Sequence, residues 1–255
     1  MLFGEEQQVN KCVSNPIKMD VRETAQKLFS KANDLRAENK YKEAAKEYLN
    51  SIMLNRNNPK AYFGLGLAYK ELNNYKKSSS ALKKAGELSP FDAEIFAELG
   101  ISEIINGNFP EAIKAFQRSI KLNPENYDVQ IQLAMAHELD DEEDMALMIY
   151  QRIIEKNPMF VKAYIQKATL CLSLEYYVDS ACLFKKVLEL DPEYSRAYLG
   201  IGICCDKLNK KKEALRYYKK FLNSKTESLN TEKVYERISA LKECFVTRQH
   251  SLKVI

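Results

Sequence analysis

The feature of this sequence that most constrains its fold is a repeat with an interval of 34 residues. The stretch GNFPEAIKAFQRSIKLNP at 107–124 returns as the related stretch DEEDMALMIYQRIIEKNP at 141–158. Stepping by 34 from Phe116 meets only large apolar or aromatic residues: Tyr48, Leu82, Phe116, Tyr150, Phe184 and Tyr218. Two further columns hold only small residues: Ala32, Gly66, Gly100, Ala134, Ala168 and Gly202, and then Ala44, Ser78, Ala112, Ala146, Ser180 and Ala214. Agreement of three columns over six units rules out coincidence.

Two short helices per unit that cross closely explain these columns. Helices approach each other closely only where side chains are small, and a large residue four positions later on the same face fills the space beside the contact. Four prolines spaced 34 residues apart end the second helices, because proline lacks the N–H that a helix interior needs: Pro90, Pro124, Pro158 and Pro192. With 8 Gly and 7 Pro in 255 residues, the chain has too few turn residues for a many-stranded β fold. The pattern therefore predicts an all-α protein.

The columns and prolines resemble those of the tetratricopeptide repeat (TPR) family, whose unit is a 34-residue helix–turn–helix. The clearest units are AYFGLGLAYKELNNYKKSSSALKKAGELSP at 61–90 and AYLGIGICCDKLNKKKEAL at 197–215. The resemblance covers residues 23–226 and implies a right-handed superhelical solenoid of antiparallel helix pairs. Its six units lie at about 25–58, 59–92, 93–126, 127–160, 161–194 and 195–228.

The sequence departs from the family pattern at Glu103 and His137, which are polar where packing is expected, and at Thr226, which replaces the last proline. Glu103 and His137 occupy one column in adjacent units. They can hydrogen-bond to each other and form a pH-sensitive joint, or each can extend to a helix edge. The second interpretation is favoured.

The two ends of the array are predicted to differ from the repeats. An array leaves an apolar face at its last unit, and a helix with one polar side must cover it. We expect this capping helix at 229–247, where Val234, Ile238, Leu241 and Phe245 fall on one face. Residues 1–22 and 248–255 are predicted to be a flexible segment and a tail.

No pattern of catalytic, cofactor-binding or metal-ligating residues is found. The chain has no Gly-rich phosphate loop, HExxH, GxSxG or CxxC, and it has only two histidines. The adjacent Cys204 and Cys205 can form a redox pair or a soft metal site, but Cys205 shares a repeat column with Cys171, which favours packing. We therefore predict a non-catalytic protein without cofactor, metal or small-molecule substrate. No apolar run is long enough to span a membrane, no secretory signal is recognised, and a cytoplasmic protein with reduced thiols is expected.

In the TPR family, the first helices line a concave groove that receives a peptide or helix of another protein, so the resemblance implies such a groove here. One row of groove positions reads Phe29, Phe63, Ala97, Ile131, Ile165 and Leu199. A second row reads Asn33, Leu67, Ile101, Met135, Thr169 and Ile203. Most of these are apolar, and an exposed apolar strip indicates a binding site. A register error of one residue would instead bury them between helices.

Charged residues flank the two rows. A third row on the first helices reads Gln26, Lys60, Glu94, Asp128, Lys162 and Arg196. With Glu98, it makes the middle acidic and both flanks basic, which favours a partner with a basic centre and acidic ends. One subgroup of the family clamps acidic chaperone tails. The positions of that clamp correspond here to Phe29, Asn33, Gly64, Glu94 and Glu98. Only Asn33 fits the clamp, so we reject this function.

The leading hypothesis is thus a scaffold or adaptor that binds a partner protein in its groove. The alternative is a structural subunit that assembles through its edges or convex face, with itself or with other subunits. A polyanion binder that uses the basic run at 207–225 is a third possibility, although nucleic acid is disfavoured because the net charge is only +4 and no RNA-binding motif is present. The acidic run at 138–144 can bind calcium or a partner, but capping and the helix dipole explain it better. Association between its acids and the basic run of another molecule is also possible.

Overall fold

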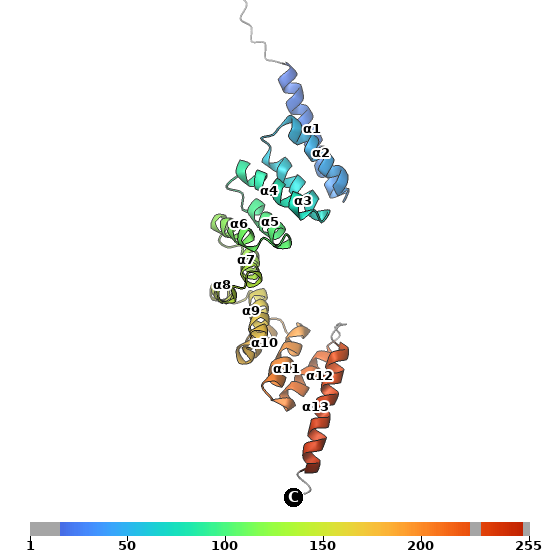
Figure 1. The fold of residues 1–255 in the computed structure, drawn as a ribbon, viewed down its shortest axis with the longest axis vertical. Coiled ribbons are helices and arrows are strands. Elements are labelled where there is room, and N and C mark those ends of the chain that lie inside the picture. Colours follow the sequence, from blue (N-terminus) through green and yellow to red (C-terminus); the bar gives the residue numbers. More distant parts are fainter. Residues whose placement is uncertain (1–15, 225–230, 252–255) are drawn as a thin grey trace, which may run out of the picture. The chain divides into compact units, whose positions relative to one another are not determined.

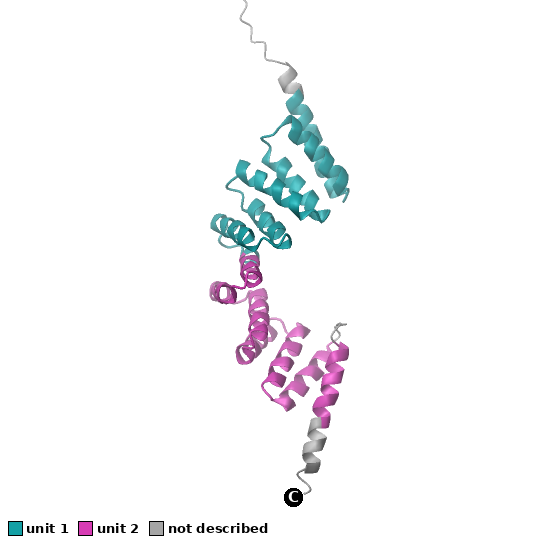
Figure 2. Ribbon diagram, in the orientation of Figure 1, with its two compact units in different colours: residues 1–129 teal, residues 130–255 magenta. Residues whose placement is uncertain are grey.

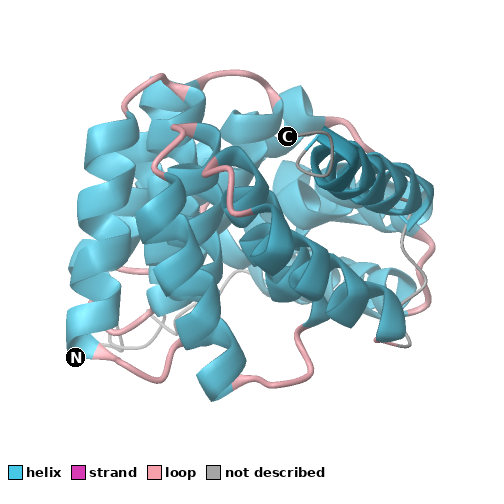
Figure 3. Cartoon of the chain, turned by 90° about the horizontal axis from the view of Figure 1, so that it is seen from below, coloured by secondary structure: helices cyan, strands magenta, loops and turns pink. Residues whose placement is uncertain are grey.

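A computed structural model describes the backbone of residues 16–224 and 231–251 and the side chains of residues 21–224 and 231–243. Within these ranges the chain forms thirteen α-helices and no strands (Figures 1 and 3). The first helices of the pairs are α1 (Pro16–Ala37), α3 (Pro59–Glu71), α5 (Ala93–Ile105), α7 (Tyr127–Leu139), α9 (Val161–Ser173) and α11 (Ser195–Lys207). The second helices are α2 (Tyr41–Leu54), α4 (Tyr75–Leu88), α6 (Phe109–Leu122), α8 (Glu143–Lys156), α10 (Tyr177–Leu190) and α12 (Lys211–Asn223), and α13 (Thr231–Ser251) follows. The predicted all-α fold of helix pairs is confirmed.

The two terminal helices are longer than the sequence predicts. Helix α1 begins at Pro16, inside the segment expected to be flexible, because proline is well suited to a first helical position. Helix α13 continues to Ser251, beyond the expected end at 247, since no Gly or Pro interrupts it. The expected tail beyond Ser251, residues 1–15 and the side chain of Phe245 lie outside the described residues.

The chain divides into two compact units, residues 1–129 and 130–255 (Figure 2). In the first unit each helix packs against the next, and the first helices α1, α3 and α5 also contact one another in order. In the second unit α9 to α12 follow the same arrangement, α9 contacts α11, and α13 packs against α12. Within each unit, first helices therefore form one layer and second helices the other.

The predicted columns meet in the core of each helix pair. A Cβ added to Gly100 would lie 2.5 Å from the Phe116 ring, and one added to Gly66 would lie 2.6 Å from the Leu82 side chain. The large residue of the second helix is thus pressed against the backbone of the first helix, which only a small residue permits. Gly64 contacts Tyr48 of the preceding 34-residue repeat in the same way. A large residue of this column can therefore join its own repeat to the next repeat.

The last unit and α13 share one apolar core. Val234, Ile238 and Leu241 of α13 are buried with Tyr217 and Phe221 of α12. Arg237 of α13 donates two hydrogen bonds to Asp206 of α11, at 2.6 and 2.8 Å, and these bonds lower the pKa of that carboxyl. The core contacts remove apolar surface of α12 from water, and the paired charges fix how α13 lies on the last unit.

A fourth column, which the sequence analysis missed, forms the turn inside each unit. One residue per unit has a φ between 56° and 77°: Asn39, Asn73, Gly107, Asp141, Glu175 and Asn209. The following N–H bonds to a carbonyl five residues back, as from Lys40 to Leu35 at 2.9 Å, so the turn is a Schellman motif. Gly, Asn and Asp adopt this left-handed conformation at a lower cost than Glu does.

Replacing Glu175 with asparagine should therefore stabilise the chain by about 0.5–1 kcal/mol, because asparagine adopts a positive φ at lower cost. The Tyr177 hydroxyl hydrogen-bonds to the Glu175 side chain. The asparagine oxygen should accept this bond in its place, as Asn73 accepts from Tyr75 at 2.8 Å. Urea unfolding followed by circular dichroism measures the change. The reverse substitution, Asn73→Glu, should destabilise by a similar amount, and a Glu175→Asn protein no more stable than the wild type would contradict this explanation.

Candidate protein-binding surface

The predicted groove rows occupy one face of the first helices, with a consistent gradient of exposure. Residues of the flanking row are all exposed: Gln26, Lys60, Glu94, Asp128, Lys162 and Arg196. Those of the two apolar rows are half-buried: Phe29, Phe63, Ala97, Ile165 and Leu199, and then Asn33, Leu67, Ile101, Met135 and Ile203. Thr169 is exposed, and Ile131 is buried with 4% of its surface accessible. Ile131 therefore differs from the rest of its row and offers little surface to a partner.

Half-burial means that one side of these side chains joins the core while the other remains accessible. In the first unit, Phe63 packs against buried Leu82 and Leu99, and Phe29 lies against Tyr48 with 6.1 Å between ring centroids. In the second unit, the row residues Ile165, Leu199 and Ile203 pack against the buried core. Packing on one side fixes the rotamers, so a partner would meet preordered apolar surface.

Two predicted polar positions have partners within the protein. Lys70 lies 2.6 Å from Glu98, and about a fifth of each side chain is exposed. Because Lys70 balances its charge, Glu98 does not add to the acidic charge expected in the middle of the groove. Asn33 accepts a hydrogen bond of 2.6 Å from the hydroxyl of Tyr48. Both residues therefore hold neighbouring helices or side chains in place.

The structure adds two apolar residues that the sequence analysis missed. Ile105 is 50% exposed and Leu139 is 47% exposed. They lie four residues after Ile101 and Met135, and residues at that spacing share a helix face. The same periodicity that identified the rows would have found them.

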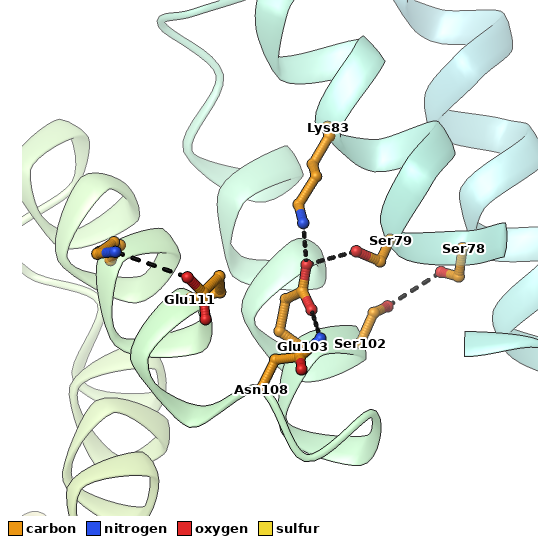
Figure 4. A network of polar contacts seen from close by, with 8 residues as sticks. Ser78, Ser79, Lys83, Ser102, Glu103, Asn108 and Glu111 are labelled. Carbon is orange, nitrogen blue, oxygen red and sulfur yellow. Dashed lines mark hydrogen bonds and ion pairs between the residues drawn. The ribbon is translucent and has the colours of Figure 1, made fainter. Parts of the chain in front are cut away.

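Glu103 and His137 are buried, and neither extends to a helix edge as the favoured interpretation predicted. Glu103 is 1% exposed and binds Ser79 at 2.5 Å, Lys83 at 2.6 Å and Asn108 at 2.7 Å (Figure 4). Burial alone would raise the pKa of this carboxyl, but these hydrogen bonds outweigh it and hold the pKa below its ordinary value. His137 Nδ1 lies 2.6 Å from Glu142 instead. Glu103 and His137 thus each bind other residues, whereas a pH-sensitive joint would require them to bind each other.

The hydroxyls of the tyrosines in the large column are also bonded. Tyr150 donates to Glu138, and Tyr218 donates to Asp206 at 3.3 Å. Burial, followed by the neighbouring carboxylate, raises the pKa of both tyrosines well above the ordinary range. These hydroxyls stay protonated at neutral pH and serve as donors that fix the first helix against the second.

Three of the four cysteines with described side chains serve packing, and the fourth, Cys182, is exposed. Cys171, Cys204 and Cys205 are buried, and burial raises the pKa of each thiol, which disfavours the reactive thiolate. Among the residues whose placement is described, no cluster of three His, Cys, Asp or Glu side chains could hold a metal ion. In the same part of the chain, no helix combines the length and apolarity needed to cross a bilayer.

Comparison with known families agrees with this architecture. Models of the tetratricopeptide repeat match residues 59–92, 93–126 and 195–227, and a TPR repeat model matches residues 32–73. These matches together span half of the chain. The chain belongs to the tetratricopeptide repeat family. No curated protein sequence matches it.

Three solved structures share the fold of this TPR chain at low sequence identity. The TPR protein YrrB, described as having an unusual peptide-binding site, is 19% identical with a TM-score of 0.58 over 75% of this chain and 99% of its own. The type IV pilus biogenesis factor PilW is 16% identical with a TM-score of 0.66 over 83% and 98%. The C-terminal part of a TPR protein from Cytophaga hutchinsonii is 20% identical with a TM-score of 0.69 over 77% and 78%. At these identities the likeness concerns the fold.

Proposed function

We propose that this TPR protein is a non-catalytic adaptor that binds a peptide or helix of a partner protein along its first helices. The observation that carries the proposal is the run of preordered, half-buried apolar side chains there, which continues to exposed Ile105. Packed apolar anchors supply most of the affinity of a protein interface. YrrB, which shares the fold, is described as having an unusual peptide-binding site.

The flanking charges would set the register of the partner. In the first unit, Lys60 and Glu94 are exposed beside the apolar rows, and in the second unit Lys162 and Arg196 are exposed. Within each compact unit, acidic side chains of a partner would lie near these cations, and in the first unit a basic side chain would lie near Glu94. Because these charges remain in water, they would affect encounter and specificity more than affinity.

The test replaces two groove residues of the first unit together, Ile101→Glu and Ile105→Glu. A partner retained by the immobilised wild-type protein from its native cell extract would be identified, purified and titrated against both forms. We expect its affinity to fall at least about tenfold, since two charges would have to be buried against the partner. Ile131 is unsuitable for this test, because its burial would make a charge there unfold the helix pair.

The matched control is Met53→Glu, which adds a charge at a residue of α2 that is 73% exposed. It should leave the affinity unchanged, and circular dichroism should show folded protein for both variants. If the groove variant is folded and binds the partner as tightly as the wild type does, the adaptor proposal is wrong.

A further inference from the structure

A row of cations on the outer face of α12 has no counter-charge in the described part of the protein. Arg216 follows Lys212 by four residues, and Lys219 and Lys220 follow Arg216 by three and four, so all four lie toward one helix face. The row extends about 12 Å along the helix. No ion pair joins any of the four to an acid within residues 21–224 and 231–243. We call these four residues the lysine face.

Lysines equivalent to Lys220 have acidic partners in two earlier repeats. Lys84 in α4 pairs with Glu87 at 2.7 Å, and Lys186 in α10 pairs with Glu189 at 2.8 Å. In α12 the position of these glutamates is occupied by Asn223. The last repeat thus keeps this cation, Lys220, and lacks the acid that pairs with its equivalents.

Aromatic rings hold the lysine face in place. The Arg216 guanidinium lies over the Tyr217 ring at 5.1 Å, and the Lys220 ammonium lies over the Tyr198 ring at 5.4 Å. Glu213, the one acid on α12, has a carboxylate oxygen 3.9 Å from Cys205 of α11. The helix dipole does not account for the cations at the start of α12, because it favours acids there. The arrangement favours an acidic ligand on this face.

The chain itself carries a complementary surface at the turn between α7 and α8. Asp140, Asp141, Glu142, Glu143 and Asp144 are consecutive, and among them only Glu142 has a described basic side chain as partner, His137. Capping and the helix dipole were expected to explain these acids. Glu143 and Asp144 lie in the first turn of α8, where the dipole favours acids, but Glu142, the N-cap, makes no side-chain capping bond. Next to them, Met145 is 44% exposed and Met148 is 59% exposed. We call residues 140–148 the acid–methionine face.

From these observations we propose that the acid–methionine face of one molecule docks on the lysine face of a second copy. The aspartates would pair with the cations, and the methionines would contact the Tyr198 ring and the lysine stems. The two faces lie on different helices, so the contact is heterologous. It leaves the lysine face of the first molecule and the acid–methionine face of the second free to bind further copies, so that a chain of molecules can form. Exposed ion pairs are individually weak and screened by salt, so association should be weak and salt-sensitive.

Sedimentation velocity on the full chain tests this proposal in solution. At about 20 mM salt the mean mass should rise with protein concentration, and at about 500 mM salt the protein should remain monomeric. The triple variant Arg216→Glu, Lys219→Glu, Lys220→Glu should be monomeric at both salt concentrations. The triple variant Asp140→Lys, Asp141→Lys, Asp144→Lys tests the other face and should also be monomeric, so the proposal stays testable if the first variant fails to fold.

A mixture of the two variants restores opposite charges on the docking faces and should associate at low salt. The matched control is Lys42→Glu, Lys46→Glu, Lys121→Glu, which makes the same change in net charge at exposed positions of α2 and α6 and should associate as the wild type does. A monomeric wild type at low salt, or a control that loses association as fully as the lysine-face variant, overturns the proposal. The Ile101→Glu, Ile105→Glu protein should self-associate normally, which separates this test from that of the groove.

Discussion

Replacing Phe116 with alanine should lower the free energy of unfolding by about 3–5 kcal/mol, a large share of the stability of an ordinary domain. The side chain is fully buried, and its ring lies against the backbone of Gly100. Gly100 has no side chain that could move into the space, so the cavity would remain open and the loss should approach the upper end of this range. Urea unfolding followed by circular dichroism measures the effect.

Phe116→Leu provides the matched control, because leucine occupies the same column at Leu82. It retains most of the buried volume and should cost about 1–1.5 kcal/mol. Met53→Ala, at a residue that is 73% exposed, should change the stability by less than about 0.5 kcal/mol. If Phe116→Ala were as mild as Met53→Ala, the column would not carry the packing between the two helices of the unit.

The helix pairs were predictable because their periodicity is repeated six times in the sequence. A small residue at Gly100 and a large one at Phe116 have meaning only when two helices cross, and the structure shows that crossing. The turn column was also present in the sequence, as Asn39, Asn73 and Asn209 show, but one glutamate concealed it. A column is easiest to recognise where packing restricts it to one residue size, and a turn restricts the backbone instead.

Individual polar partners were harder to predict, because they depend on which side chains of neighbouring helices reach each other. Asn33 fits a peptide-binding position by spacing, yet its oxygen accepts from Tyr48. A rule can be recognised afterwards: where the large column holds tyrosine, the first helix supplies an acceptor, as Glu138 does for Tyr150 and Asp206 does for Tyr218. The rotamers that bury Ile131 but leave Ile101 half-exposed follow from packing of the whole unit, which no single column encodes.

Replacing Glu103 with alanine should cost about 3 kcal/mol, although glutamate stands where the family pattern predicts an apolar residue. The carboxylate joins α4 to α5 by binding Ser79 and Lys83, and it also binds Asn108 in the turn after α5 (Figure 4). Its removal would leave these donors without their acceptor and open a cavity beside them. Glu111→Ala, at an exposed acid of α6, is the matched control and should be nearly neutral.

Glutamine at position 103 separates the effect of the charge from that of the shape, and pH reveals the difference. Because the pKa of Glu103 is lowered in the folded protein, its ionisation stabilises the fold fully above the unfolded pKa near 4.5, and this contribution is lost as the pH falls through the folded value. The wild type should therefore exceed Glu103→Gln in stability at pH 7, and the difference should shrink as the pH is lowered below about 4.5. A difference that stayed constant with pH would mean that hydrogen-bond geometry, rather than the charge of Glu103, holds α4 and α5 together.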